Sequence, residues 1–314
     1  MKAAVIDQDD QYRLVEQDTP RPGPGEVAIS VAYAGIQWGD VLVRDGHFPV
    51  PRPFVPGFEA AGHIVGLGAG VRDRQVGEPV LALLSAGGYA EVAVAPAELT
   101  LPVGQVPLRT AAGLGWAGPT AYDLVTTVAR VRPGDRVLLH AAAGSVSTLA
   151  AQFATAAGAA ELTGVVGSAE RAAYAGRFGY AEVLTREEFP DKLSGPFDVI
   201  LDPVGGPTRI ANQALLAPHG RLAAYGSIAG GEPTEHSADD LLAQGQSLVT
   251  YNSSLLSRTH PGRLADSTKR ALAEVASGAV RVDITAEYDL ADLATAVRRL
   301  SQGATLGKSV VRVA

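Results

Sequence analysis

The feature that most constrains the fold is a regular alternation of short apolar segments with helical segments from residue 120 to residue 227. The expected helices cover residues 120–130, 146–157, 169–178 and 208–216, and the expected strands read RVLLHA, ELTGVVG, AEVLT, FDVILDPVG and RLAAYGS. Each strand is almost entirely apolar, as strands of a parallel sheet are when helices cover both faces of the sheet. The pattern therefore predicts a doubly wound parallel sheet in an α/β protein.

The segments on either side of this alternation differ from it. Up to about residue 115, short apolar runs such as EVAISVAYAGI and GYAEVAVAP are separated by glycine and proline, which is typical of a β-rich, barrel-like unit. After residue 260 come two helical segments and two strand-like segments, the last of which is GKSVVRVA. Since 314 residues exceed the usual size of one core, we expect two domains, with the C-terminal tail returning to the first.

Composition and charge exclude several classes of function. The net charge of -7 and the lack of any lysine or arginine run argue against nucleic acid or an acidic membrane surface, and favour a small-molecule substrate. The chain has no cysteine, which excludes disulfides, thiolate zinc sites and a cysteine nucleophile. Its six histidines show no metal-binding spacing, so we expect no metal. No signal peptide or long apolar span is apparent, which predicts a cytoplasmic protein without a membrane segment.

The stretch LLHAAAGSVSTLAAQFATAAGA, residues 138–159, places a strand, a tight turn and a helix where a dinucleotide-binding turn is found. Only Gly144 remains of the expected glycines, and Ser145 and Ser147 stand where two more are usual. The N-terminus of a helix still offers N–H groups and the positive end of its dipole to a phosphate, so residues 144–147, including Val146, are candidate cofactor ligands. The alternative is that these small residues only allow the turn to pack closely and bind no cofactor.

The next strand gives a second indication. Folds that prefer NAD place an acidic residue at the end of this strand, where it holds the ribose hydroxyls. Here the strand ends in TGVVGSAER, so Ser168 and Arg171 take that place and suit the 2′-phosphate of NADPH. A solvated arginine in the first turn of a helix is the alternative.

Several stretches together carry a family resemblance: AGIQWGDVLVRDGHFP, PFVPGFEAAGHIVGLGAGV, GGYAEVAVAP, GPTAYDLV, RPGDRVLLHAAAGSVSTLAAQFA, FDVILDPVGG and GRLAAYGS. In this order they resemble the medium-chain dehydrogenase/reductase superfamily, in its zinc-independent quinone oxidoreductase branch, which is related to polyketide enoyl reductase domains. The resemblance implies a GroES-like, β-rich substrate domain over residues 1–119 and 260–314 and a Rossmann domain over residues 120–259. It also implies hydride transfer from NADPH, and a homodimer that pairs through the strand SLVTY.

The resemblance assigns the remaining site residues. Zinc-dependent members carry cysteine and histidine where this chain has Gln37 and Phe58, and a tyrosine frequent in the family is replaced by Phe48. The implied catalytic residues are Gln37, His47 and Lys308. The implied cofactor residues are Thr120, Gly144, Ser145, Val146, Ser147, Ser168, Arg171, Gly226, Ser227, Tyr251 and Asn252. Some of these residues have a purely structural alternative. Gln37 can be an ordinary loop residue, Lys308 a solvated lysine, and Tyr251 with Asn252 a strand end and turn. We interpret Asp40 and Arg44, four residues apart, as an ion pair within one helix.

The leading hypothesis is a metal-free, NADPH-dependent reductase of a quinone or an activated carbon–carbon double bond. A non-catalytic NADPH-binding sensor or partner-binding protein is a second hypothesis, supported by the two serines of the loop and by Phe48. A tailoring reductase for a polyketide or another secondary metabolite is a third.

Overall fold

The computed structural model describes residues 1–193, 195–230 and 234–314. Within them the chain forms two compact units, Met1–Pro119 with Ser254–Ala314, and Thr120–Ser253. Among these residues no helix is both long enough and apolar enough to cross a membrane.

The second unit is built around a parallel sheet, as the alternating pattern predicts. Its strands, in the described part of the chain, are β8 (Arg136–His140), β9 (Glu161–Val166), β10 (Glu182–Thr185), β11 (Phe197–Asp202), β12 (Leu216–Ala224) and β13 (Ser247–Thr250). They lie side by side in the order β10-β9-β8-β11-β12-β13, and every pairing is parallel. The central strands β8 and β11 are buried almost throughout, because their apolar side chains point into cores on both faces.

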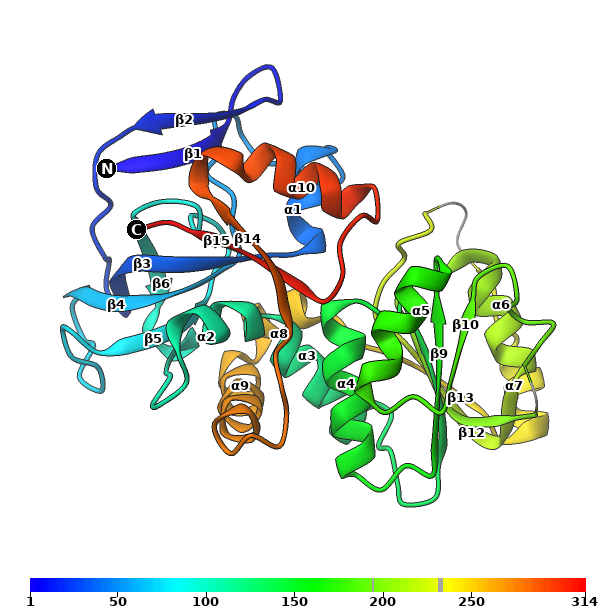
Figure 1. Ribbon diagram of the computed structural model, residues 1–314. Coiled ribbons are helices and arrows are strands. Elements are labelled where there is room, and N and C mark those ends of the chain that lie inside the picture. The colour runs from blue at the N-terminus through cyan, green and yellow to red at the C-terminus, as the bar shows by residue number, and fades with distance from the viewer. Residues whose placement is uncertain (194, 231–233) are drawn as a thin grey trace. The chain divides into compact units, whose positions relative to one another are not determined.

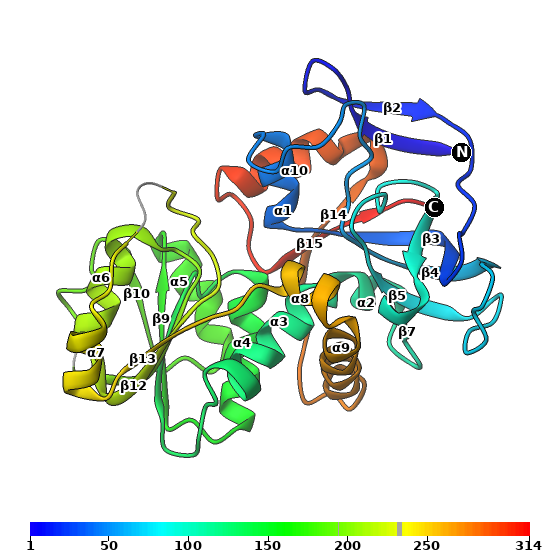
Figure 2. The ribbon, with the colours of Figure 1, turned by 180° about the vertical axis from the view of Figure 1, so that it is seen from behind.

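Helices cover both faces of this sheet. Figures 1 and 2 show α4 (Ser145–Ala156) and α5 (Ala169–Ala175) on one side, and α6 (Gly206–Ala214) and α7 (Ala238–Gln244) on the other. Helix α3 (Ala117–Asp123) precedes the sheet and continues as a π-helical turn over Leu124–Val128. The core of the sheet includes Leu138, Val165, Phe197, Ile200, Leu216 and Leu222.

The first unit is β-rich. Its strands are β1 (Lys2–Ile6), β2 (Tyr12–Glu16), β3 (Glu26–Ile36), β4 (Glu59–Leu67), β5 (Pro79–Leu83), β6 (Val92–Pro96), β7 (Thr100–Pro102), β14 (Ile284–Asp289) and β15 (Lys308–Arg312). The strands β1 and β2 form an antiparallel hairpin, and the main sheet runs β14-β15-β3-β4-β5-β7, with β6 also paired to β3. Strand β15 pairs antiparallel with β3, so the C-terminal tail is part of the N-terminal sheet.

The helices of the first unit lie around this sheet. They are α1 (Trp38–Arg44), α2 (Leu108–Leu114), α8 (Ser253–Thr259), α9 (Pro261–Ala276) and α10 (Leu293–Ser301), with short 3-10 turns at Ala97–Leu99 and Leu290–Asp292; a third 3-10 turn, Gly176–Phe178, follows α5 in the second unit. Helix α1 lies beside α10 (Figure 1). Both helices add apolar side chains to the core of the sheet. The fold is α/β, with a GroES-like β-rich unit and a Rossmann-like parallel-sheet unit.

Candidate functional site

Most candidate residues of the parallel-sheet unit follow the carboxyl ends of its strands. Strand β8 leads to Gly144, β9 to Ser168, β12 to Gly226 and Ser227, and β13 to Tyr251 and Asn252. The chain places β9 and β10 on one side of β8, and β11, β12 and β13 on the other. Open α/β sheets bind ligands at the carboxyl edge of the strands, where the strand order reverses in this way. The topology thus gathers these candidates at one edge of the sheet.

The N-terminus of α4 can receive an anion. Gly144 is its N-cap residue, with extended backbone angles of φ -84° and ψ 161°, and no side chain caps the helix there. A Cβ atom built on Gly144 would meet only the carbonyl oxygen of Ala141, at 3.1 Å. The helix is 12 residues long, so its first-turn N–H groups and the positive end of its dipole face this open position. The residues present here therefore fit the pyrophosphate of a dinucleotide.

The two serines of the loop differ in their surroundings. The hydroxyl of Ser147 is buried and donates a hydrogen bond of 2.8 Å to the carbonyl oxygen of His140, the last residue of β8. Ser147 therefore joins helix to strand, at the position where a dinucleotide-binding turn uses glycine for close packing. Ser145 is half-buried and begins the helix. Of the two hydroxyls, that of Ser145 is the one without an internal acceptor among the contacts of the described residues.

Two arginines flank the tip of β9. A Cβ atom built on Gly167 would lie 4.0 Å from Cδ of Arg171 and 4.0 Å from Nη2 of Arg186. Burial lowers the pKa of Arg171; the negative charge of Glu170 opposes this effect, and the positive charge of Arg186 adds to it. Ser168 is the N-cap of α5, and its hydroxyl accepts the backbone N–H of Arg171 at 3.4 Å. The sequence predicts roles for Ser168 and Arg171 but not for Arg186, which directly follows β10.

A buried carboxylate shapes the next turn of this edge. Asp202, the last residue of β11, accepts the N–H groups of Val204 at 2.6 Å and Gly205 at 3.0 Å, and Nε of Arg209 at 2.9 Å. Arg209 also donates to the carbonyl oxygen of Gly226 at 2.6 Å. Sequence reasoning did not single out Asp202 or Arg209, although FDVILDPVGG was among the stretches that carried the resemblance.

The other candidates of this unit have the following surroundings. Tyr251 donates from its hydroxyl to Asp123 at 2.7 Å. Thr120 is buried within α3, and Asn252 and Ser227 are exposed. Val146 is half-buried in the first turn of α4.

The three candidate catalytic residues lie in the β-rich unit. Gln37 is half-buried and lies between β3 and α1, whereas His47 is exposed in the segment after α1. The neighbouring Phe48 is also exposed, with 49% of its surface accessible. Lys308, at the start of β15, is only 3% exposed, and its ammonium group forms a buried ion pair with Glu59 of β4. The sequence did not predict this ion pair. We propose that, because its ammonium group is held by Glu59, Lys308 supports the structure of the site.

A second carboxylate is buried close to this ion pair. Asp40 of α1 is 0% exposed, and its Oδ2 accepts the backbone N–H of Gln37 at 2.9 Å and the hydroxyl of Tyr89 at 2.7 Å. Burial raises the pKa of Asp40 to about 7 despite these two hydrogen bonds. The predicted ion pair between Asp40 and Arg44 is wrong: Arg44 binds Asp45 instead, at 2.7 Å and 3.0 Å, because Asp40 points into the core.

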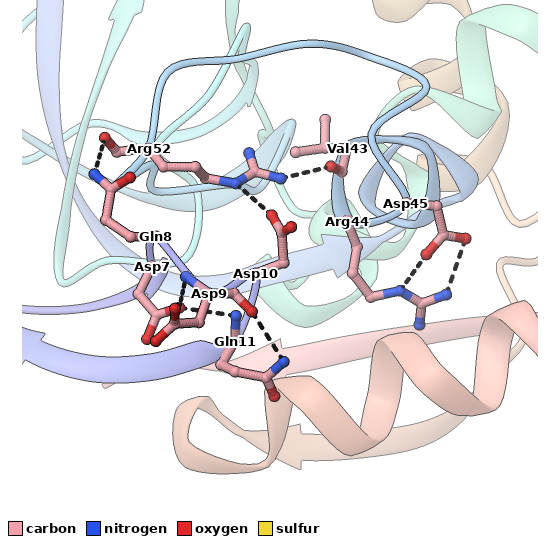
Figure 3. Close-up of polar contacts among 9 residues, drawn as sticks. All are labelled: Asp7, Gln8, Asp9, Asp10, Gln11, Val43, Arg44, Asp45 and Arg52. Atoms are coloured by element: carbon pink, nitrogen blue, oxygen red, sulfur yellow. Dashed lines mark hydrogen bonds and ion pairs between the residues drawn. The ribbon is translucent and has the colours of Figure 1, made fainter.

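The segment that carries His47 and Phe48 is anchored to the tip of the β1–β2 hairpin (Figure 3). Arg52 donates to Asp10 at 3.0 Å and to the carbonyl oxygen of Val43 at 2.9 Å. Gln8 returns a hydrogen bond of 2.6 Å to the carbonyl oxygen of Arg52. Arg52 therefore connects the C-terminal end of this segment both to α1, through Val43, and to the hairpin, through Asp10 and Gln8.

Two family models match the chain. Residues 23–105 match the alcohol dehydrogenase GroES-like domain, and residues 178–311 match the zinc-binding dehydrogenase family. In the described ranges no group of three or more histidine, cysteine, aspartate or glutamate side chains is arranged to hold a metal ion.

Solved structures and curated proteins add finer likenesses. A quinone oxidoreductase from Escherichia coli, solved in complex with NADPH, has a TM-score of 0.91 and 26% identity over the whole of both chains. A mycobacterial quinone oxidoreductase has a TM-score of 0.87 and 30% identity, again over the whole of both chains. A 2-haloacrylate reductase from a Burkholderia species is 29% identical over 318 residues, which is 96% of this chain and 95% of that protein.

A further likeness is to much longer proteins. A phthioceranic/hydroxyphthioceranic acid synthase from Mycobacterium tuberculosis is 29% identical over 93% of this chain, but the chain spans only 14% of the length of that synthase. The full-length match to quinone oxidoreductases, together with the GroES-like and dehydrogenase matches, assigns the family. The chain belongs to the medium-chain dehydrogenase/reductase superfamily, in its zinc-independent quinone oxidoreductase branch.

Proposed function

We propose that the protein is an NADPH-dependent oxidoreductase that reduces a quinone or an activated carbon–carbon double bond. The observation that carries this proposal is the pairing of two anion-binding features at the carboxyl edge of one parallel sheet. These are the uncapped N-terminus of α4 at Gly144, and the arginines Arg171 and Arg186 at the tip of β9. They follow the neighbouring strands β8 and β9, which are the two places where a dinucleotide-binding sheet receives the pyrophosphate and the 2′-phosphate.

The residues of the parallel-sheet unit would hold and orient the cofactor. The first turn of α4 would bind the pyrophosphate through backbone N–H groups, and the hydroxyl of Ser145 would add one hydrogen bond. Arg171 and Arg186 would neutralise the 2′-phosphate, and the phosphate would relieve the repulsion between the two guanidinium groups. When bound, the reduced nicotinamide supplies a hydride.

On the acceptor side, Gln37 would polarise a carbonyl oxygen by donating a hydrogen bond from its side chain. Such an acceptor already lacks electrons, so modest polarisation and correct positioning are sufficient for reduction. Phe48 has no hydroxyl, so it cannot donate the proton that a tyrosine at this position would supply. His47 lies in the same exposed segment, next to Phe48, and we keep it as the candidate catalytic residue there.

Two relatives support both the cofactor and the class of acceptor. The Escherichia coli relative was solved with NADPH, and the name of the Burkholderia relative describes reduction of a 2-haloacrylate, whose double bond is conjugated to a carboxylate. A cytoplasmic location and a homodimer are parts of the same proposal.

The test has two steps on the purified protein. First, equilibrium titration compares the dissociation constants of NADPH and NADH, and tighter binding of NADPH is expected. Second, oxidation of NADPH is followed with 1,4-benzoquinone, with 2-chloroacrylate and with a short α,β-unsaturated thioester. Turnover with either of the first two acceptors supports the proposal, and treatment with a chelator should leave it unchanged.

The other outcomes distinguish the alternatives. Reduction of the thioester alone would favour a reductase of polyketide-like chains, which the likeness to the mycobacterial synthases suggests. Binding of NADPH without reduction of any acceptor would favour a non-catalytic sensor. Equal affinity for the two cofactors would remove the basis of the NADPH assignment.

A further inference from the structure

Asp40 is a buried carboxylate to which the proposed reaction assigns no role. It lies in the first turn of α1, three residues after Gln37, and none of its surface is accessible. Its Oδ2 atom receives two hydrogen bonds, from the backbone of Gln37 and from the hydroxyl of Tyr89. Its Oδ1 atom is buried without a hydrogen-bond partner among the described residues. A carboxylate in this position is poorly stabilised when it is ionised.

The surrounding charges do not compensate for this burial. Lys308 lowers the pKa of Asp40, but its ammonium group is paired with Glu59, whose own charge raises the pKa. Tyr89 faces Asp40 directly, and burial and the charge of Asp40 raise its pKa in turn, so it serves as a donor. Tyr12 of β2 also faces the charge of Asp40, and Arg44, Asp45 and Arg52 surround that tyrosine. Helix α10 packs on α1 with Leu293, Ala296 and Val297, which are apolar.

The carboxyl group is joined to Gln37 through the backbone. The hydrogen bond from the Gln37 N–H to Oδ2 is 2.9 Å long and fixes the entry of the chain into α1. The single O–H hydrogen of Tyr89 is shared between the same oxygen, at 2.7 Å, and the carbonyl oxygen of Gly35, at 3.1 Å. Asp40 and Tyr89 thus hold the segment between Gly35 and Gln37 at two points.

We propose that Asp40 is a positioning residue for the proposed reduction: its carboxyl group, held by Tyr89, fixes Gln37 in the orientation that serves the acceptor. This inference rests on the proposed function of Gln37.

The burial of Asp40 beside Gln37 should make turnover depend on pH. With Asp40 neutral, the group of Asp40, Glu59 and Lys308 carries no net charge, because the other two form an ion pair. Ionisation of Asp40 adds a buried negative charge beside Gln37. Hydride transfer to a carbonyl-conjugated acceptor builds negative charge on the acceptor oxygen, and a like charge opposes it. Turnover should therefore fall as pH rises through the range in which Asp40 ionises.

The experiment compares four forms of the full chain: the natural protein, Asp40→Asn, Tyr89→Phe and Asp45→Asn. For each, kcat/KM for 1,4-benzoquinone with saturating NADPH is measured between about pH 6 and pH 9, and a several-fold decline with rising pH is expected in the natural protein. Asp40→Asn keeps an acceptor oxygen but cannot ionise, so its profile should vary less than about twofold over the same range. Tyr89→Phe removes a donor that stabilises the ionised carboxyl, so its decline should shift to higher pH.

Asp45→Asn is the matched control, because Asp45 is an exposed carboxylate at the end of the same helix and pairs with Arg44. Its profile should equal that of the natural protein. A readout independent of turnover is the infrared carbonyl band of a protonated carboxyl group, which should be present at about pH 6 in the natural protein and absent in Asp40→Asn.

The outcomes separate this inference from the proposed function. If the natural protein reduces no acceptor, the proposed function fails, and the positioning role fails with it even if the infrared band is present. If the natural protein is active and Asp40→Asn keeps its pH profile, or if the infrared band is unchanged by Asp40→Asn, the inference about Asp40 is overturned while the proposed function stands. Should Asp40→Asn not fold, an unshifted profile in Tyr89→Phe would overturn it equally.

Discussion

At the tip of β9, Cδ of Arg171 and Nη2 of Arg186 each lie 4.0 Å from a Cβ atom built on Gly167, and we propose that both arginines serve the 2′-phosphate of NADPH. We expect NADPH to bind more tightly than NADH, and Arg171→Ala to reduce this preference by about 1–3 kcal/mol, the value of a charge-assisted hydrogen bond. Arg186→Ala should reduce it in the same direction. Titration of each variant with both cofactors measures the effect.

Arg132→Ala is the control for this pair, since Arg132 is exposed and lies before β8, at the opposite end of the strand. It should leave both dissociation constants unchanged. If the natural protein does not discriminate between the cofactors, both arginines lose their assigned role.

The serines of the α4 loop allow a second prediction. Replacing both Ser145 and Ser147 by glycine should change the affinity for NADPH by no more than about 1 kcal/mol, because the backbone N–H groups remain. The same double variant should be less stable by roughly 1–2 kcal/mol, since it loses the hydrogen bond from Ser147 to His140 and places glycine in a helix. A hundredfold gain in affinity would instead identify the natural loop as an impaired site.

The buried carboxyl group of Asp40 should also make the free energy of unfolding depend on pH. The pKa of this group is raised from 3.8 to about 7 in the folded protein, so the folded state keeps a proton that the unfolded state releases. The contribution of Asp40 to the free energy of unfolding is therefore complete below pH 4 and lost as pH rises to about 7, and it amounts to about 4 kcal/mol at most. Urea unfolding of Asp40→Asn should show a smaller decline over this range than that of the natural protein. An equal decline in both would contradict the assignment.

At the scale of elements, the parallel-sheet unit was predictable because its strands are apolar throughout and its helices lie between them. Helix α7 (Ala238–Gln244) was missed: the charged stretch GGEPTEHSADD, residues 230–240, is interpreted from its sequence as a solvated acidic loop, and none of the side chains of the helix is buried. The hydroxyl of Ser237 accepts the N–H of Asp240, so a capping signal was present in the sequence. The β1–β2 hairpin was not singled out at all. Residues 231–233 of that acidic segment lie outside the described residues.

The link between the hairpin and the segment after α1 can be tested at this scale. Arg52→Ala removes a charged donor from the carbonyl oxygen of Val43, and we expect a loss of about 1–3 kcal/mol in the free energy of unfolding. Asp10→Asn should cost less than about 1 kcal/mol, because the ion pair between Arg52 and Asp10 is largely exposed on the aspartate side. Urea unfolding of both variants decides the point, and equal losses would show that the exposed ion pair is the stronger contact.

At the scale of the whole molecule, β13 forms one edge of the parallel sheet in the described residues, with no strand on its outer side. An uncovered edge tends to pair with another chain, so we expect a dimer formed through β13. The N–H of Tyr251 points to β12, and the period of two along a strand directs the N–H of Thr250 outward. Thr250→Pro should therefore weaken the dimer without breaking the pairing of β12 with β13, while Thr250→Val should not.

Sedimentation of the natural protein and of both variants at micromolar concentration measures this. A natural protein that sediments as a monomer contradicts the prediction.

The candidate site was only partly predictable, because its polar contacts join distant parts of the chain. Gln37, Ser168 and Arg171 could be named from local patterns and from the resemblance. The contact between Tyr89 and Asp40 joins residues 49 positions apart, and the ion pair between Lys308 and Glu59 joins residues 249 positions apart. No local pattern encodes such pairs, since they follow from how the strands are ordered in the β-rich sheet.

That strand order has a consequence for how the chain is made. A ribosome releases the chain from the N-terminus, and domains generally fold as they emerge. The unit over Thr120–Ser253 is continuous and can fold as soon as its own residues are free. The β-rich unit begins to emerge first but must finish last, because β15 pairs with β3 and supplies Lys308 to the buried Glu59. Until β15 has emerged, the nascent chain carries an open strand edge at Tyr33–Ile36 and a carboxylate, Glu59, that lacks its partner, which makes this the interval in which it most needs protection by a chaperone.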